Sequence, residues 1–353
     1  MTSLSEMKNI IKRAVRTGTN VHFSGNPGIG KTSIIEQTVQ DIQQKDKDFK
    51  LWILYTPAMS PLDFTAVVPD MKTKQLITMH NTRLPNAFDC PDQRGIVFLG
   101  EFWNADQDTN KCLQKYLNNE DMGGFMKPKN VIVISDSNDI AHHSGVVSQS
   151  LALLSRSRSV TVFCDVKTTM PHFEDIGVVS SIISFLTARP DLIDNFEQLL
   201  STNTRSQWAN PRSWVRLSNA IKDADKHDEE LTEDEIIGDI GEAVGREFIG
   251  FVRAMKTLVK YVDIVANPEQ AEIPSAVSDR YAVMAMLAES VQFKEATSVF
   301  SYVDRYDQEL QVLFMRLLYK GRNPDMKKIT ESEKFVGWIK SKPELIEIIS
   351  KRA

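Results

Sequence analysis

The chain has 353 residues, of which 42% are hydrophobic and 25% charged, as in an ordinary folded protein of one or two domains. Its formal charge of -5 gives no overall basic surface for gripping a phosphate backbone, so nucleic acid is not the expected partner. Three cysteines without CxxC spacing support neither a zinc cluster nor a disulfide framework, and no run approaches ~18 apolar residues, so we expect a cytoplasmic protein without a membrane partner.

Short β-rich runs alternate with amphipathic helical patterns through the first half of the chain. Each run is nearly continuous in apolar residues and is followed by polar or glycine-rich residues. Strands of this kind, separated by helices, predict an α/β fold with a parallel five-stranded sheet that helices cover on both faces. The predicted strands are NVHFSG (20–25), LWILY (51–55), GIVFLG (95–100), VIVIS (131–135) and SVTVFC (159–164).

After Asp165 the β signal fades and the pattern becomes helical. An acidic run, DADKHDEELTEDEI (223–236), predicts a solvated break between two helical stretches. We therefore expect an α/β core over 1–165, a helical lid over 166–225 and a C-terminal helical region over 226–353.

The segment GNPGIGKT, Gly25 to Thr32, matches the phosphate-loop pattern G-x-x-x-x-G-K-[ST] and lies between an apolar strand and a helical stretch. Its glycines let successive backbone N–H groups face phosphate oxygens, and the helix N-terminus adds its positive dipole. Lys31 is expected to reach the β- and γ-phosphates, and the Thr32 hydroxyl to bind Mg²⁺. The predicted cofactors are ATP and Mg²⁺, held by Gly25, Asn26, Pro27, Gly28, Ile29, Gly30, Lys31, Thr32 and Ser33.

From this motif outward, over about residues 4–220, the chain resembles the AAA+ ATPases and, within them, the MoxR branch with its CbbQ-type activases. LYTPAMSPLDFTAVVPD (54–70) resembles the branch's segment after the second strand, and LPNAFDCPDQRGIVFLGEFWNAD (84–106) its lead into the Walker B strand. The resemblance implies a P-loop AAA+ core, an all-helical lid and a C-terminal extension. VVPDMKTKQLITMHN (67–81) predicts a β-hairpin, either the branch's substrate-contacting insert or a plain edge hairpin.

Aligned on the Walker B segment, Glu101 falls at the catalytic glutamate that polarises the attacking water, and Gly100 at the aspartate that holds Mg²⁺ through its water shell. Losing such an orienting group typically costs about 10- to 100-fold in metal affinity or activity, so the resemblance implies weakened hydrolysis. Asp136 or Asp139, beside the end of the next strand, is a candidate substitute. Equally, Gly100 can be a core glycine at a crowded strand end.

Three further polar positions match the family. Asn138 follows a strand at the position of sensor 1, where it would help Glu101 fix the water. Arg158, or its alternative Arg156, matches the arginine that enters the neighbouring subunit's site, and Arg212 matches the sensor 2 arginine of the lid. A site completed by a neighbouring chain implies a ring, and the resemblance implies six subunits.

Three functions are compatible with these residues. The preferred one is an ATPase ring that remodels a protein partner, which by the resemblance often carries a von Willebrand factor A domain. The stretch NPRSW (210–214) also resembles bacteriophage-encoded members. The second is a hydrolysis-deficient, ATP-gated scaffold protein, because of Gly100. The third is a nucleic-acid motor or loader, which the acidic charge opposes.

Overall fold

The computed structural model describes residues 2–80, 82–138, 155–202, 206–257, 259–321 and 323–342. The chain divides into two compact units, Met1–Cys164 and Asp165–Ala353, each with its own buried core. The separation of a lid from a C-terminal region near residue 225 stays a prediction. Within the described ranges, no helix combines the length and the apolar character needed to cross a membrane.

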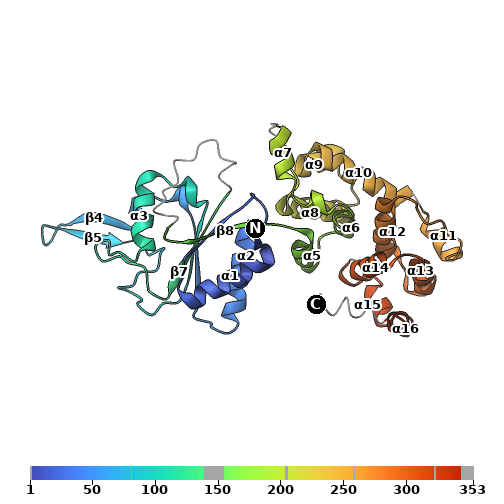
Figure 1. The fold of residues 1–353 in the computed structure, drawn as a ribbon, viewed down its shortest axis with the longest axis horizontal. Coiled ribbons are helices and arrows are strands. Elements are labelled where there is room, and N and C mark those ends of the chain that lie inside the picture. The colour runs from blue at the N-terminus through green and yellow to red at the C-terminus, as the bar shows by residue number, and fades with distance from the viewer. Residues whose placement is uncertain are drawn as a thin grey trace. The chain divides into compact units, whose positions relative to one another are not determined.

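Among the described residues, the first unit contains a parallel sheet of six strands in the order β1-β8-β2-β7-β6-β3. Figure 1 shows this sheet, with β7 and β8 labelled. The predicted parallel sheet between helices is confirmed, but it has six strands and not five. The additional strand is a two-residue segment in which Thr2 and Ser3 pair with Val162 and Phe163. So short a run carries no hydrophobic alternation, and the sequence pattern therefore does not indicate it. The strands are β1 Thr2–Ser3, β2 Val21–Ser24, β3 Lys50–Tyr55, β6 Gly95–Gly100, β7 Val131–Ser137 and β8 Arg158–Phe163.

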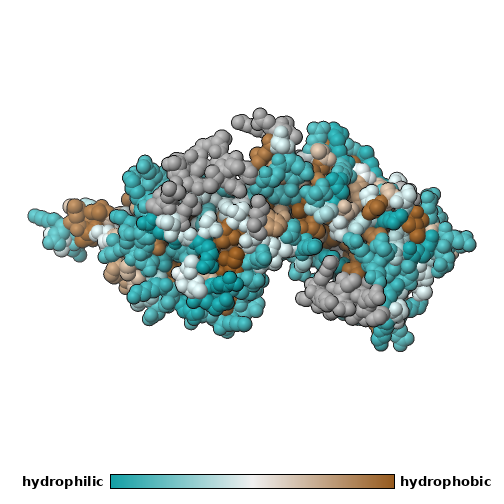
Figure 2. Space-filling view, viewed as in Figure 1, coloured by the Kyte–Doolittle hydropathy of each residue, from teal (hydrophilic) through white to brown (hydrophobic). Residues whose placement is uncertain are grey.

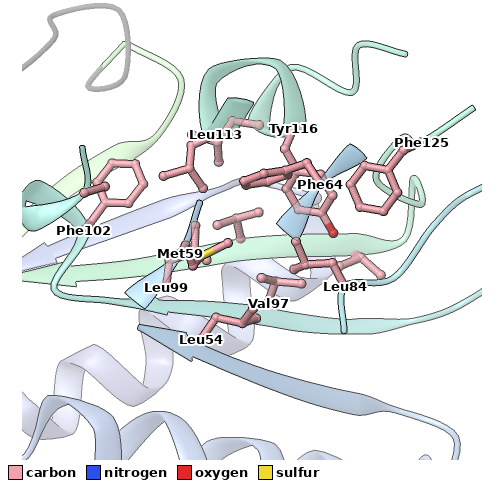
Figure 3. Close-up of a cluster of buried hydrophobic side chains, with 14 of the residues drawn as sticks. Leu54, Met59, Phe64, Leu84, Val97, Leu99, Phe102, Leu113, Tyr116 and Phe125 are labelled. Carbon is pink, nitrogen blue, oxygen red and sulfur yellow. The ribbon is translucent and has the colours of Figure 1, made fainter. Parts of the chain in front are cut away.

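Helices cover both faces of this sheet, and alternate residues of the central strands point to the two sides. On β6, Ile96 and Phe98 join a buried cluster with the first two helices, whereas Val97 and Leu99 join a second cluster with the third. Figure 3 shows the second cluster, which includes Phe102 just beyond the end of β6. The described helices of this unit are α1 Leu4–Thr17, α2 Lys31–Gln43 and α3 Gln107–Leu117, with short turns η1 Thr56–Ala58, η2 Pro61–Asp63 and η3 Phe102–Asn104.

Local sequence signals set the ends of these helices. Ser3 and Glu6 form a capping box at the start of α1, and Gly18 ends that helix in the left-handed conformation at φ +66°. Asp106 caps α3 through its carboxylate. Helix α2 differs because it begins after Gly30, which offers no capping side chain. The first N–H groups of α2 therefore have no acceptor from a cap.

A separate antiparallel hairpin, β4 Thr65–Asp70 with β5 Gln75–His80, extends from the first unit (Figure 1). The predicted hairpin is confirmed. Several of its apolar side chains face solvent, with Met71 84%, Leu76 74% and Val67 65% exposed. Figure 2 shows this hydrophobic surface on the hairpin.

The second unit is helical throughout its described residues. Trp214 is fully buried, and its Nε1–H donates to the carbonyl oxygen of Leu192 at 3.1 Å. The helices and turns are α5 Val166–Asp175, α6 Ser180–Ala188, η5 Pro190–Leu192, α7 Phe196–Thr202, α8 Pro211–His227, α9 Glu233–Ile240, α10 Glu242–Thr257, α11 Tyr261–Ala266, α12 Val277–Ser290, η6 Phe293–Glu295, α13 Ala296–Val303, α14 Gln308–Lys320, α15 Met326–Thr330 and α16 Glu333–Lys340.

Candidate functional site

The predicted phosphate loop joins the end of β2 to the start of α2, as the motif requires. The Gly25 N–H donates to the carbonyl oxygen of Ser137 at 3.2 Å, which ties the loop to the end of β7. A Cβ at Gly25 would lie 2.4 Å from the carbonyl oxygen of Val162, so only glycine fits there. Gly28 and Gly30 have φ of +82° and +101°, in the region that favours glycine. The backbone conformation and the close contacts of the loop therefore require glycine at these three positions.

Lys31 lies at the first position of α2 and its side chain turns back over the loop. Its Nζ donates to the carbonyl oxygens of Gly25 at 2.9 Å and Asn26 at 3.0 Å, and only 6% of the residue is exposed. Ile29 is buried in the adjacent cluster and anchors the loop. Thr32 is half-buried and follows at the uncapped helix N-terminus. The loop thus combines a cation, a hydroxyl and backbone N–H groups at one helix end, the chemistry that a polyphosphate needs.

The remaining loop residues occupy the positions that the motif assigns to them. Asn26 and Pro27 are half-buried between the glycines, and Ser33 is exposed in the first turn of α2. Their contribution to a cofactor stays a prediction.

Glu101 follows the end of β6 in the left-handed conformation, with φ 55° and ψ 43°. The Thr56 hydroxyl donates to its carbonyl oxygen at 2.8 Å, and the Asn104 amide donates to its Oε2 at 3.2 Å. Its own N–H donates to Asp136 Oδ1 at 3.0 Å. A non-glycine residue in this conformation costs energy and persists only where its surroundings hold it, as they do here. Glu101 is exposed, its backbone is held by Thr56 and Asp136, and its carboxylate accepts one hydrogen bond from Asn104.

Asp136 is the carboxylate that connects Glu101 to the phosphate loop. It lies in β7, and its Oδ2 is 3.9 Å from Lys31 Nζ while its Oδ1 accepts the Glu101 N–H. Its side chain is 14% exposed. Of the two substitutes considered for the missing aspartate, the structure places Asp136 beside Lys31, and Asp139 lies outside the described residues.

Gly100 has a steric explanation. It pairs with Tyr55 of the neighbouring strand β3. A Cβ at Gly100 would lie 2.7 Å from Tyr55 Cδ1 and 2.9 Å from Cε1. Contacts this short exclude any side chain at position 100 unless the tyrosine ring moves. An aspartate and this tyrosine therefore compete for one space at the end of β6.

Asn138 directly follows β7 and is half-buried. The preceding residue, Ser137, pairs with Ser24 and accepts the Gly25 N–H through its carbonyl oxygen. Asn138 therefore lies at the same sheet end as the phosphate loop and Glu101. Its sensor 1 role stays a prediction.

Sequence reasoning missed His22, a buried polar residue that connects the strands beneath the site. Its Nδ1 lies 2.9 Å from Ser135 Oγ, and its Nε2 lies 3.0 Å from Ser137 Oγ. Its ring also packs against Phe102 and Trp103. Burial, with a smaller effect of the positive charge on Lys31, lowers the pKa of His22 to about 4, so the ring is neutral near pH 7. The only signal in the sequence is a histidine inside an apolar strand.

The two arginine candidates for a neighbouring site lie toward the opposite end of the sheet. Arg158 begins β8 and pairs with Val21, the first residue of β2, whereas the phosphate loop follows Ser24. Three residues of strand, about 10 Å, separate these two levels. Arg158 is exposed, while Arg156 is half-buried and its Nε donates to Asn118 Oδ1 at 2.6 Å. The strand register therefore places the backbone of both arginines away from the phosphate loop of their own chain.

Arg212 is the second residue of α8 and is exposed. Pro211 before it and the capping box of Asn210 and Ser213 start the helix, as the sequence predicts for a helix N-terminus. Arg212 belongs to the second unit, and its sensor 2 role stays a prediction.

The residues at the loop fit a magnesium nucleotide. Among the described residues there is no cluster of three or more His, Cys, Asp or Glu side chains suited to a metal. Magnesium bound with a nucleotide does not need one, because it uses phosphate oxygens, waters and one or two protein oxygens. The Thr32 hydroxyl and the Asp136 carboxylate are oxygens of that kind.

No family model matches the chain, and no curated protein matches it. Solved structures with a similar arrangement include RuvB of Thermotoga maritima, described as a Holliday junction branch migration motor, at 12% identity over 75% of this chain and 74% of that chain, with a TM-score of 0.34. A mutant of the same RuvB has 11% identity over 76% of each chain and a TM-score of 0.38. NtrX from Brucella abortus has 14% identity over 95% of this chain and 67% of that chain, with a TM-score of 0.41. Such distant likenesses assign neither an activity nor a partner to this chain.

Proposed function

We propose that the protein binds Mg-ATP at the end of β2 and hydrolyses it. The observation that carries this proposal is one constellation at the ends of neighbouring strands. Lys31 is folded over a glycine loop, and Glu101 is held in a left-handed conformation by Thr56, Asn104 and Asp136. A loop that only turned the chain would need neither a buried lysine nor a neighbouring glutamate fixed from three sides.

Each residue has a distinct role in this proposal. Lys31 and the first N–H groups of α2 bind the phosphates, and the Thr32 hydroxyl binds Mg²⁺. Bound Mg²⁺ supplies charge that stabilises the transferring phosphoryl group. Glu101 orients and polarises the attacking water, and Asn138 holds that water with it.

We further propose that the active form is a ring in which another copy completes the site. The position of Arg158 toward the far end of the sheet, exposed and away from its own loop, supports a role in a neighbouring chain. A hexamer, and Arg212 as the lid arginine, follow from the resemblance to the MoxR branch, as does a bacteriophage source.

The partner is proposed to be a protein, with a von Willebrand factor A domain as the class that the resemblance suggests. The exposed apolar side chains of the β4–β5 hairpin support a protein contact, because solvent-facing hydrophobic patches often mark interaction sites. Coupling between ATP turnover and this contact would make the protein a remodelling ATPase.

A scaffold that binds ATP without hydrolysing it is the second candidate, and Gly100 is the observation that favours it. The three hydrogen bonds that fix Glu101 favour turnover instead, because a site that only binds does not need an oriented glutamate.

The test measures binding of a fluorescent ATP analogue in Mg²⁺ to the full chain and to Lys31→Ala. We expect the variant to lose about 100-fold in affinity, since charge-assisted hydrogen bonds to phosphate are among the strongest. Lys45→Ala is the matched control, because this exposed lysine lies just beyond the other end of α2. Equal affinity in all three proteins, or no binding by the wild type, would remove the proposal. ATP turnover by the wild type then separates the enzyme from the scaffold.

A further inference from the structure

We propose that Asp136, in β7, supplies the carboxylate that faces the Mg²⁺ of bound Mg-ATP, in place of the one that β6 lacks at Gly100. This inference rests on the proposed function, and it names a residue that the phosphate-loop motif does not contain. Three observations carry it: the strand register, the surroundings of the carboxylate, and the steric block at Gly100.

The register places Asp136 level with the missing side chain. Strands β6 and β7 are parallel neighbours, and Leu99 pairs with Ser135. One residue further along, Gly100 and Asp136 stand side by side at the same sheet end. Paired strands are about 4.8 Å apart, so a carboxylate on β7 faces the same loop as a carboxylate on β6 would.

The carboxylate of Asp136 lies between the loop lysine and the backbone of Glu101. Its Oδ2 is 3.9 Å from Lys31 Nζ, a loose pair that leaves the lysine able to bind phosphate. Its Oδ1 accepts the Glu101 N–H, so the same carboxylate also positions the glutamate. Mg²⁺ in nucleotide sites takes one or two carboxylates together with phosphate oxygens. Asp136 lies beside the loop lysine, where such a group is needed.

The steric block explains why the carboxylate is not on β6. The ring of Tyr55 occupies the space that a side chain at Gly100 would enter. With the ring in this position, a carboxylate near the loop comes from a neighbouring strand, as Asp136 does.

A purely structural role is the alternative, in which Asp136 only holds the Glu101 backbone. Asp136→Asn separates the two roles, because asparagine keeps an oxygen that accepts the Glu101 N–H but replaces the charged oxygen with an amide NH₂ group, which does not bind metal. A structural defect would weaken nucleotide binding equally with and without metal. Loss of a metal-facing carboxylate would weaken only the part that depends on Mg²⁺.

The experiment titrates Mg²⁺ into the full chain with a fluorescent ATP analogue, and repeats the binding in excess chelator. For Asp136→Asn we expect about a 10- to 100-fold rise in the Mg²⁺ concentration needed for half-maximal binding, with binding in chelator unchanged. Asp108→Asn, a 70% exposed carboxylate on α3, is the surface control.

If Asp136→Asn fails to fold, as judged by thermal unfolding, Asp136→Cys replaces it. A thiolate prefers softer metals, so this variant should bind the analogue better with Cd²⁺ than with Mg²⁺, relative to the wild type. A wild-type Mg²⁺ dependence in the asparagine variant, an equal loss with and without Mg²⁺, or no metal preference in the cysteine variant overturns the inference. Failure of the wild type to bind nucleotide overturns the proposed function instead.

Discussion

The two ends of the central sheet carry different functional groups. At the carboxyl ends of the strands lie the phosphate loop, Glu101 and Asp136, all joined by hydrogen bonds or an ion pair. Toward the amino ends lie Arg158, exposed, and Arg156, bonded to Asn118. In open α/β sheets, ligands bind in the crevice beyond the carboxyl ends of the strands. The candidate site follows this rule, whereas the proposed role of Arg158 in a neighbouring chain rests on its place toward the other end of the sheet.

Side chains on neighbouring strands at one end of the sheet lie close enough to act on the same ligand. Side chains at opposite ends of the sheet are separated by the length of the strands. Asp136 on β7 lies level with the last residue of β6 and 3.9 Å from Lys31 Nζ, at the same end of the sheet as the phosphate loop. The backbone of Arg158 lies about three residues of strand, roughly 10 Å, from the level of its own phosphate loop.

The largest expected effect concerns Arg158. Arg158→Ala should lower the ATP hydrolysis rate by about 10³- to 10⁵-fold, the range for arginines that reach a neighbour's γ-phosphate. Arg156→Ala should have a much smaller effect, because its Nε is already bound to Asn118 Oδ1. The measurement is steady-state phosphate release.

Mixing variants shows whether Arg158 acts on another copy. Lys31→Ala chains would lack a working loop but keep the arginine, so adding them to Arg158→Ala chains should restore part of the activity. No recovery on mixing, together with full activity of Arg158→Ala alone, would contradict the contrast between the two ends.

A smaller effect concerns His22, which joins β2 to β7 beneath the site. Its pKa falls from 6.5 to about 4 on folding, so the unfolded chain binds a proton that the folded chain does not. The free energy of unfolding therefore has its full value, as far as His22 is concerned, above pH ~6.5. It decreases as the pH falls toward ~4, by up to roughly 3 kcal/mol. Urea unfolding at about pH 7 and about pH 4.5 measures it.

Two histidine substitutions test whether this pH dependence comes from His22. His22→Gln should flatten the pH dependence of the unfolding free energy, whereas His227→Gln, at a histidine whose side chain is 52% exposed, should leave it as in the wild type. The same slope in all three proteins would show that His22 is not neutral in the fold.

The smallest effect concerns Gly100. Gly100→Asp should destabilise the protein by about 1–3 kcal/mol, because the new side chain meets the Tyr55 ring. Tyr55→Ala in the same chain should recover most of that loss, as measured by a double-mutant cycle of unfolding free energies. A single Gly100→Asp variant that is as stable as the wild type and binds Mg-ATP more tightly would mean that the space is open and that Asp136 has not taken the role.

Much of the fold was predictable because its signals are local. The phosphate loop is a contiguous pattern, the central strands are continuous apolar runs, and the hairpin alternates over a short segment. The strand β1 was not predictable, since two residues carry no period. At the site, Lys31 and Glu101 followed from motif and resemblance, whereas Thr56 and His22 did not, because their partners lie 45 and 113 residues away in sequence.

The amino-acid sequence by itself determined that a glycine loop with a lysine joins a buried strand to a helix, since each requirement is met by neighbouring residues. Only the tertiary structure decided which carboxylate stands beside that lysine, why Gly100 has no side chain, and on which end of the sheet Arg158 lies. These outcomes depend on the register between strands that are distant along the chain. Register follows from which strand faces are buried and from the connections between strands, so it is decided only when distant segments pack together.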